Sequence, residues 1–160
     1  MPDATTATQY GERTVTLKRT FDAPRALVWK CWTDPKHMAQ WFGPTHFTNP
    51  VCELDVRPGG ALYIVMRAPD GAEYPMKGMF REVVANERLV FTNIAVDKDG
   101  NHLLEGETTV TFDEQDGKTT LTLTARAVGL VPQAPQMLAG MEAGWTQSID
   151  KLEVLVARLR

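Results

Sequence analysis

The sequence predicts a single α+β domain over residues 13–160, in which a curved antiparallel sheet of about seven strands wraps round a long C-terminal helix. Three observations predict this fold. A strand pattern is followed by two short helical patterns, six further strand patterns follow with hairpin-length links, and a long amphipathic helical pattern ends the chain. Residues 1–12 show no such periodicity and are expected to form a disordered tail.

The first strand and the two short helices are expected within residues 13–44. Apolar and polar residues alternate from residue 13 to Phe21, as in a half-buried strand. Prolines suit the first turns of the two helices that follow, and Asp34 can cap the second. Gly43 and the proline after it should end that helix.

The six later strands are predicted from alternating runs that are separated by turn-forming residues. Short links favour antiparallel pairing of neighbouring strands. The last helix is expected from about Gln136 to Leu159, with apolar residues at spacings of three and four. The alternating runs cover residues 51–57, 61–68, 73–83, 88–96, 103–114 and 118–127.

One helix is a narrow cover for so wide a sheet, and a cavity is expected between them unless large side chains fill the interior. Gly140 and Gly144 lie on one flank of the helix's apolar stripe, although glycine costs about 1 kcal/mol in a helix interior. Two explanations remain open. The glycines allow close approach of a neighbouring element, or they leave room for a ligand beside Met137, Met141 and Trp145.

The candidate ligand-binding residues are aromatic and methionine side chains, with inward-facing residues of the strands. The segment 37–47 is a candidate lid, because Trp41 and Phe42 directly precede a Gly-Pro break. A plain core role remains the alternative for the aromatic residues. Adaptable methionine walls favour flat or irregular apolar ligands. The candidates are Trp32, Trp41, Phe42, Met66, Met76, Phe80, Phe91, Asn93, Met137, Met141 and Trp145.

No catalytic residue, metal site or cofactor is expected from the sequence. Ser148 is the only serine, and without a paired histidine it is expected to be a packing residue. The histidines, even together with Cys52, lack the ligand spacing of a zinc site. They are His37, His46 and His102.

Three polar residues share parity with the apolar side chains of their strands: Arg19, Glu82 and His102. All three lie near strand ends, where a bulge can turn a side chain outward. If they point inward instead, they would supply the few polar groups typical of a small-molecule site.

Charge and composition exclude several classes of partner. Lys and Arg number 17 against 20 Asp and Glu, which leaves a net charge of −3 and no basic stripe for nucleic acid. Cys31 and Cys52 fit two reduced core thiols. No stretch approaches the length of about 20 apolar residues that a transmembrane helix needs. The protein is therefore expected to be soluble and cytoplasmic, without membrane insertion.

Four ordered motifs carry a resemblance to a known family over residues 14–159. They are FDAPRALVWKCWTDPKHMAQWFGP, VCELDVRPGGALYIVM, ERLVFTN and GMEAGWTQSIDKLEVLV. They resemble the family named after the activator of heat shock protein 90 ATPase, within the START-like (SRPBCC) superfamily of helix-grip folds. The resemblance implies a START-like ligand-binding domain. It does not fix the function, because the superfamily includes lipid binders, cyclases and co-chaperone domains.

Three functions follow as hypotheses. The first is binding or carriage of a small, largely apolar molecule, aromatic, polyketide-like or lipid-like, between the sheet and the last helix. The second is a cyclase- or aromatase-like enzyme, in which Arg19, Glu82, His102 or His46 would orient or protonate a substrate. The third is a co-chaperone-like module that contacts a chaperone ATPase.

Overall fold

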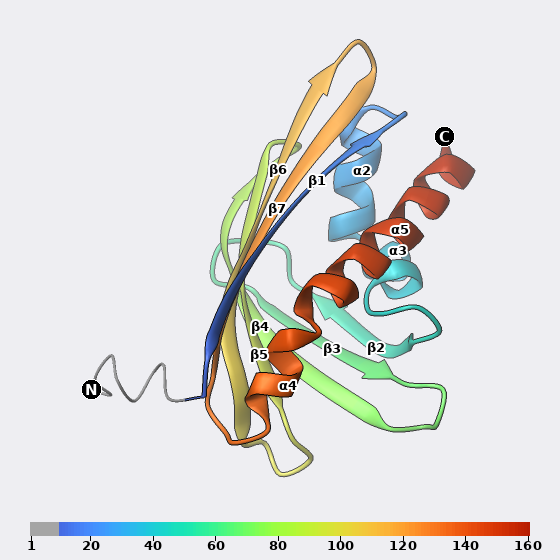
Figure 1. Cartoon of the computed structure of the whole chain (residues 1–160). Helices are drawn as coiled ribbons and strands as arrows, with labels where there is room; N and C mark the ends of the chain where they lie inside the picture. The colour runs from blue at the N-terminus through green and yellow to red at the C-terminus, as the bar shows by residue number, and fades with distance from the viewer. Residues whose placement is uncertain (1–9) are drawn as a thin grey trace.

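The computed structural model describes residues 10–160, which form one curved sheet with helices on its concave side (Figure 1). The expected tail lies outside the described residues except for residues 10–12, and strand β1 already begins at Glu12. The elements are β1 (Glu12–Phe21), α2 (Arg25–Thr33), α3 (Pro35–Trp41), β2 (Thr48–Leu54), β3 (Ala61–Arg67), β4 (Glu73–Val84), β5 (Arg88–Val96), β6 (His102–Gln115), β7 (Lys118–Gly129), α4 (Ala134–Ala139) and α5 (Met141–Leu159).

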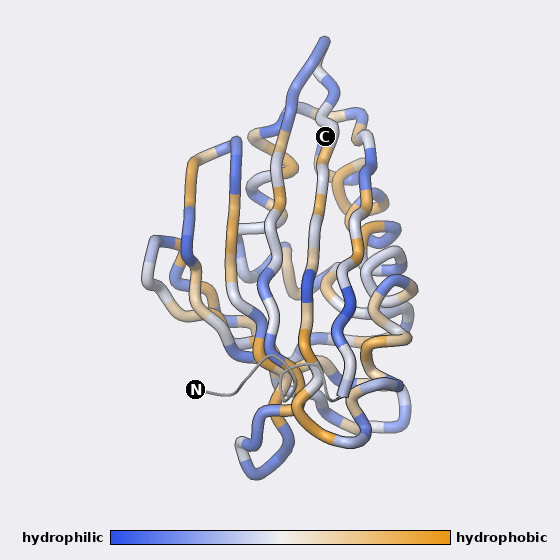
Figure 2. The backbone as a smooth tube through the Cα atoms, turned by 60° about the vertical axis from the view of Figure 1, so that its left-hand side comes forward, coloured by the Kyte–Doolittle hydropathy of each residue, from blue (hydrophilic) through white to orange (hydrophobic). Residues whose placement is uncertain are grey.

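The sheet has the strand order β1-β7-β6-β5-β4-β3-β2, and every neighbouring pair is antiparallel. Hydrophobic and hydrophilic residues alternate along its strands (Figure 2), so one face is apolar. Helix α5 runs obliquely across that concave face, while α2 and α3 cover one end of it (Figure 1). This arrangement confirms the predicted α+β helix-grip fold.

Local sequence explains the ends of several elements. The Asp34 side chain accepts a hydrogen bond of 2.9 Å from the Lys36 N–H and so caps α3, as predicted. Between β6 and β7, Asp116 and Gly117 both have positive φ angles, of 55° and 78°. That combination is typical of the tight turn in a two-residue hairpin.

The last helical segment is interrupted, and the prediction of one continuous helix was wrong in this respect. Helix α4 ends at Ala139 and α5 begins after Gly140. The Arg13 guanidinium on β1 donates hydrogen bonds of 3.0 and 2.9 Å to the carbonyls of Leu138 and Ala139. These are carbonyls that a helix end leaves without partners, so Arg13 stabilises the break.

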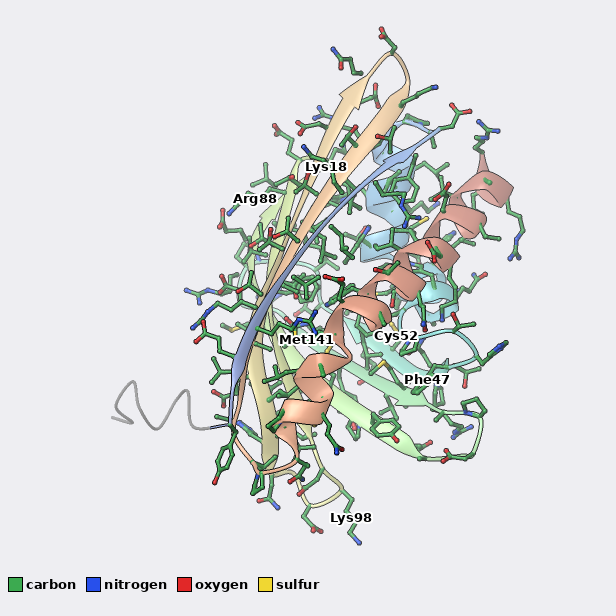
Figure 3. All side chains as sticks on the ribbon, viewed as in Figure 1. Lys18, Phe47, Cys52, Arg88, Lys98 and Met141 are labelled. Atoms are coloured by element: carbon green, nitrogen blue, oxygen red, sulfur yellow. The ribbon has the colours of Figure 1, made fainter. Side chains whose placement is uncertain are left out.

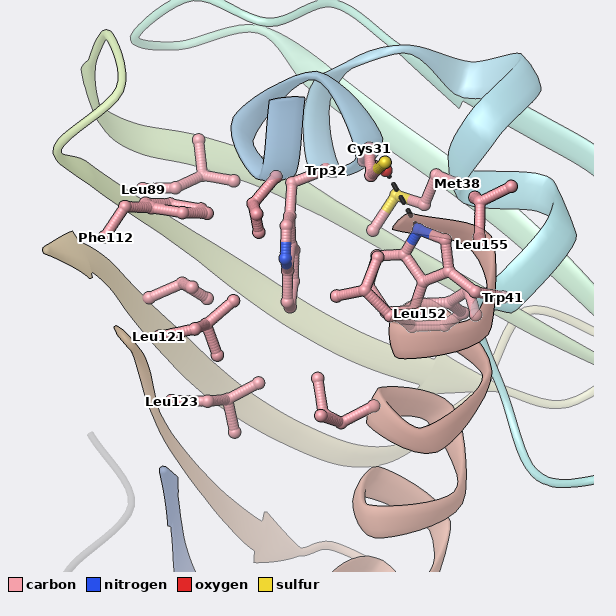
Figure 4. Close-up of a cluster of buried hydrophobic side chains, with 14 of the residues drawn as sticks. Cys31, Trp32, Met38, Trp41, Leu89, Phe112, Leu121, Leu123, Leu152 and Leu155 are labelled. Carbon is pink, nitrogen blue, oxygen red and sulfur yellow. Dashed lines mark hydrogen bonds between the residues drawn. The ribbon is translucent and has the colours of Figure 1, made fainter. Parts of the chain in front are cut away.

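The core is densest under α2 and α3 (Figure 4). Trp32 and Trp41 lie fully buried there with ring centroids 4.6 Å apart, and Trp32 faces Phe112, Leu121 and Leu123 of the sheet. The Trp41 Nε1–H donates 2.9 Å to the Cys31 carbonyl, shown as a dashed line in Figure 4. This end of the concave face is therefore filled by protein. Among residues 10–160, no helix is long and apolar enough to cross a membrane.

Candidate ligand-binding site

The concave face changes from large to small side chains along its strands. After the buried Thr119, strand β7 turns five further residues inward in order: Leu121, Leu123, Ala125, Ala127 and Gly129. On β6, the residues paired with the first four shrink in the same direction, from Phe112 and Val110 to Thr108 and Gly106, while Gly129 is paired with Leu104 at the end of the strand. Antiparallel pairing therefore gathers the small residues into one floor at the end of the sheet that α2 and α3 do not cover.

A cavity of about 360 Å³ lies over this floor. Helix α5 and helix α4 form its roof, β3 and β4 supply one wall, and the loop before β2 supplies part of the rim. Figure 3 labels Met141 of α5 and Phe47 of that loop, which both line the cavity. Its volume falls within the range of about 300–1,000 Å³ that is usual for small-molecule sites, and its lining is mostly apolar.

The structure brings together seven of the predicted candidates around this cavity. The side chains come from the loop after α3, the sheet, and both C-terminal helices. They are Phe42, Met66, Met76, Asn93, Met137, Met141 and Trp145.

The other four candidates lie in the core and do not line this cavity. Trp32 and Trp41 are fully buried, while Phe80 and Phe91 are 2% and 1% exposed. They lie where α2 and α3 already cover the sheet, so large side chains meet each other instead of open space. Trp32 still contributes indirectly, because it stacks against Trp145 at a centroid distance of 6.2 Å.

The floor of small residues escaped the sequence analysis. Its members are Ala95, Gly106, Ala125 and Ala127. The side chains at the inward positions of β7 shorten from leucine to alanine to glycine, and this trend was the available signal. The sequence analysis used the alternation along β7 only as a sign of burial. At Gly106 the size limit is strict, since an added Cβ would lie 2.1 Å from the Arg126 carbonyl oxygen.

The loop of residues 42–47, here called the rim loop, is tied to α5 by hydrogen bonds. The Ser148 hydroxyl accepts 3.0 Å from the Gly43 N–H and donates 2.9 Å to the Gly144 carbonyl. Farther along, Gln147 Oε1 accepts 3.0 Å from the Thr45 N–H, and Lys151 Nζ donates 3.0 Å to a rim-loop carbonyl. The predicted lid is therefore a rim that is hydrogen-bonded to the roof.

The two glycines of the last helical segment have different roles. Gly144 lines the cavity, and an added Cβ would lie 3.9 Å from Pro44 Cγ. The neighbouring element is the rim loop rather than α2 or α3, and 3.9 Å is an ordinary contact, so close approach does not require a glycine here. Room for a ligand beside Gly144 stays a prediction. Gly140 is exposed and marks the break between α4 and α5, so its expected place beside a ligand or a packed element was wrong.

Asn93 is the one carboxamide among the residues that line the cavity. Its Oδ1 accepts a hydrogen bond of 2.8 Å from the Thr108 hydroxyl, and its Nδ2 lies 3.7 Å from Met76 Sδ. Thr108 is 1% exposed, so this polar pair lies within an otherwise apolar surrounding.

The polar residues that share parity with the apolar side chains of their strands do not line the cavity. Arg19 reaches α5, where it pairs with Asp150 at 2.9 Å and with Glu153 at 2.7 Å. No bulge turns it outward, so that explanation was wrong for Arg19.

The bulge explanation holds for the other two. Glu82 follows a register shift after Phe80 and pairs with Arg88. His102 lies at a shift on β5 and β6, with Nδ1 2.7 Å from Glu105 Oε1. His46, in the rim loop, does not line the cavity either.

The two thiols are free and poorly reactive. Burial raises the pKa of both Cys31 and Cys52 to about 11, so the unreactive protonated form dominates at neutral pH. Among residues 10–160, no three His, Cys, Asp or Glu side chains gather closely enough to hold a metal ion. The described site is therefore an apolar cavity with one side-chain amide.

Comparisons with known proteins agree with this fold. The sequence model of the family described as "Activator of Hsp90 ATPase homolog 1-like protein" matches residues 22–157. No curated protein matches the chain.

Solved structures of several bacterial proteins are similar over most of the chain. A crystal structure from Nitrosomonas europaea is 29% identical, covers 91% of this chain and 94% of its own, and has a TM-score of 0.72. One from Chromobacterium violaceum is 28% identical, covers 89% and 96%, and has a TM-score of 0.75. A protein from Silicibacter pomeroyi that carries the same family name is 24% identical over 92% and 100%, with a TM-score of 0.76, and supports the fold alone.

Proposed function

The chain belongs to the family of homologues of the activator of heat shock protein 90 ATPase, and we propose that it binds a small, largely apolar molecule between its sheet and helices α4 and α5. The supporting observation is the contrast between the two ends of one concave face. Large residues fill the end under α2 and α3, whereas small residues leave about 360 Å³ open at the other end. We propose further that this molecule is aromatic, polyketide-like or lipid-like, and that the protein is cytoplasmic.

The hydrophobic effect supplies enough free energy for such binding. A ligand that buries about 280 Å² of apolar surface gains about 7 kcal/mol at about 25 cal/mol per Å². That gain corresponds to a dissociation constant of about 10 μM. Ordering the ligand lowers the net free energy of binding, and the apolar surface that the cavity wall buries raises it. Binding in the micromolar range is therefore expected.

The residues on which the enzymatic alternative depended lie outside the cavity. Arg19, Glu82 and His102 each pair with a charged side chain outside the cavity, and His46 does not line it. A general acid or base must reach the reacting atom within hydrogen-bond distance. These four residues therefore do not support acid–base chemistry on a molecule held in this cavity.

The experiment compares two alanine-to-leucine variants. In Ala127→Leu an isopropyl group enters the cavity floor, whereas Ala157→Leu makes the same change on the exposed side of α5. Binding of 1-anilinonaphthalene-8-sulfonate, an anionic dye with a large apolar aromatic part, is measured by fluorescence and calorimetry. We expect micromolar binding by the parent and by Ala157→Leu, and at least tenfold weaker binding by Ala127→Leu with an unchanged or higher melting temperature.

Equal affinity of Ala127→Leu and the parent would refute binding at this site. A parent chain that binds no apolar probe but stimulates a heat shock protein 90 ATPase would favour the co-chaperone-like alternative. Mass spectrometry of the bound molecule after incubation distinguishes carriage from turnover.

A further inference from the structure

The cavity presents one amide group to its occupant. On the basis of the proposed function, we propose that Asn93 selects planar aromatic ligands that carry a carbonyl or ring-hydroxyl oxygen on an otherwise apolar skeleton. The Asn93 Nδ2–H donates to that oxygen. The site would then discriminate against the same skeleton without oxygen.

Thr108 fixes the orientation of this amide. Its hydroxyl donates to Asn93 Oδ1 at 2.8 Å and is almost fully buried, so turning the amide over would take this acceptor from the hydroxyl and point Oδ1 at Met76 Sδ, which cannot donate. With Oδ1 engaged, Nδ2 has only Met76 Sδ as a partner, at 3.7 Å. A thioether is a weak acceptor, so the amino group retains donor capacity that an oxygen of the ligand can use.

The floor leaves space for that oxygen beside the amide. Asn93 is paired with Gly106 on β6, and Gly106 with Ala127 on β7. Neither residue carries a side chain beyond Cβ, and Gly106 admits none because of the Arg126 carbonyl oxygen. A ligand atom can therefore approach Asn93 across the surface of Gly106.

The other polar side chains of the lining are already engaged or face solvent. The Ser148 hydroxyl bonds the backbone of Gly43 and of Gly144, and Arg126 pairs with Glu12 on the exposed side of the sheet. Tyr74 is 46% exposed at the mouth. Among the amide and hydroxyl groups of the lining, Asn93 is thus the donor that a ligand can recruit.

The walls favour an aromatic skeleton. Trp145 stacks against Trp32 with an interplanar angle of 21° and meets Phe42 edge-on at 5.7 Å, which holds its ring in place. The methionines of the lining add thioethers, which pack favourably against aromatic rings. A flat ring system fits between these walls with its oxygen directed at the amide.

Fluorenone and fluorene provide the test, since they share a skeleton and differ in one carbonyl oxygen. We expect the parent to bind fluorenone about fivefold more tightly than fluorene, as one net hydrogen bond predicts. Asn93→Leu should bind both equally. In ¹⁵N NMR spectra of the parent, the Asn93 side-chain amide should shift with fluorenone and much less with fluorene.

A second pair of variants keeps the test independent of whether Asn93→Leu folds. Thr108→Val removes the hydroxyl that orients the amide and should reduce the preference about twofold. Thr111→Val makes the same change on the outer face of β6 and should leave the preference intact. Equal binding of the two ligands by the parent would overturn this inference while leaving the proposed function standing, whereas binding of neither ligand would count against both.

Discussion

Trp145 and Trp32 stack with their ring centroids 6.2 Å apart, and together they form the partition between the cavity and the filled core. One of the two rings lines the cavity, while the other is fully buried behind it. The sheet beneath changes from leucine to alanine at the same level, since Leu123 and Ala125 are successive inward residues of β7. A single concave face therefore contains both a core and a cavity.

This partition predicts which tryptophan reports on ligand. Of the chain's 4 tryptophans, Trp145 alone lines the cavity. Trp145→Phe should lose most of the ligand-induced quenching of fluorescence, while affinity measured by calorimetry falls by less than about tenfold, since an aromatic ring remains. Trp29→Phe, which removes a tryptophan packed on Phe112, should keep the quenching. Quenching that survives in Trp145→Phe would place the ligand elsewhere.

Asp34 should make part of the stability dependent on pH. Desolvation raises the pKa of its carboxyl, but hydrogen bonds from the backbone N–H of Lys36 and from His37 outweigh this and hold it below its usual value. A carboxyl with a lowered pKa stabilises the fold above its unfolded-state value, and that contribution is lost as pH falls through the lower, folded-state value.

The test is urea unfolding of Asp34→Ala and Asp34→Asn at pH 7 and at pH 2.5. Loss of the cap should cost about 1 kcal/mol at pH 7 in the alanine variant and less in asparagine, which also caps helices. At pH 2.5 the deficit of Asp34→Ala should shrink. A deficit that is the same at both pH values would assign the effect to packing instead of charge.

The sequence predicted the order of elements because alternation and helical spacing are local properties. The break at Gly140 was missed because it depends on Arg13, which lies on a strand far away in the chain and donates to the carbonyls before the glycine. Arg13 lies on the same side of β1 as Val15 and Leu17. A charged residue on that side was the available signal in the sequence.

The division of the aromatic residues between core and cavity could not be predicted in the same way. Trp32 and Trp145 both lie on apolar helix faces, and what separates them is the end of the sheet that each helix covers. The inward residues of β7 shorten within the sequence, but the register between β6 and β7, which pairs Gly106 with Ala127, is needed to show that the small residues of both strands lie side by side.

The Ser148 hydroxyl should stabilise the rim loop. Ser148→Ala leaves the buried Gly43 N–H without its acceptor, which costs about 1–3 kcal/mol and outweighs the better helix propensity of alanine. Urea unfolding should show this loss, and hydrogen exchange at Gly43 should become faster. Thr146→Ala, on the same helix, is the control and should change exchange at Gly43 little. Unchanged exchange in Ser148→Ala would mean that the hydrogen bond does not hold the rim.

Gly144 should respond oppositely to small and large substitutions. It lies in the regular part of α5, and the nearest atom to an added Cβ is Pro44 Cγ at 3.9 Å, an ordinary contact. Gly144→Ala should therefore raise the free energy of unfolding by about 0.5–1 kcal/mol through helix propensity.

Gly144→Leu carries a branch that must enter the cavity or displace Pro44 of the rim loop. It should weaken binding of 1-anilinonaphthalene-8-sulfonate at least tenfold, as calorimetry would show. Gly140→Ala is the control, because Gly140 is exposed and has a negative φ of −86°, and it should leave binding unchanged. If Gly144→Leu bound the dye as the parent does, this flank of α5 would not face the occupied part of the cavity.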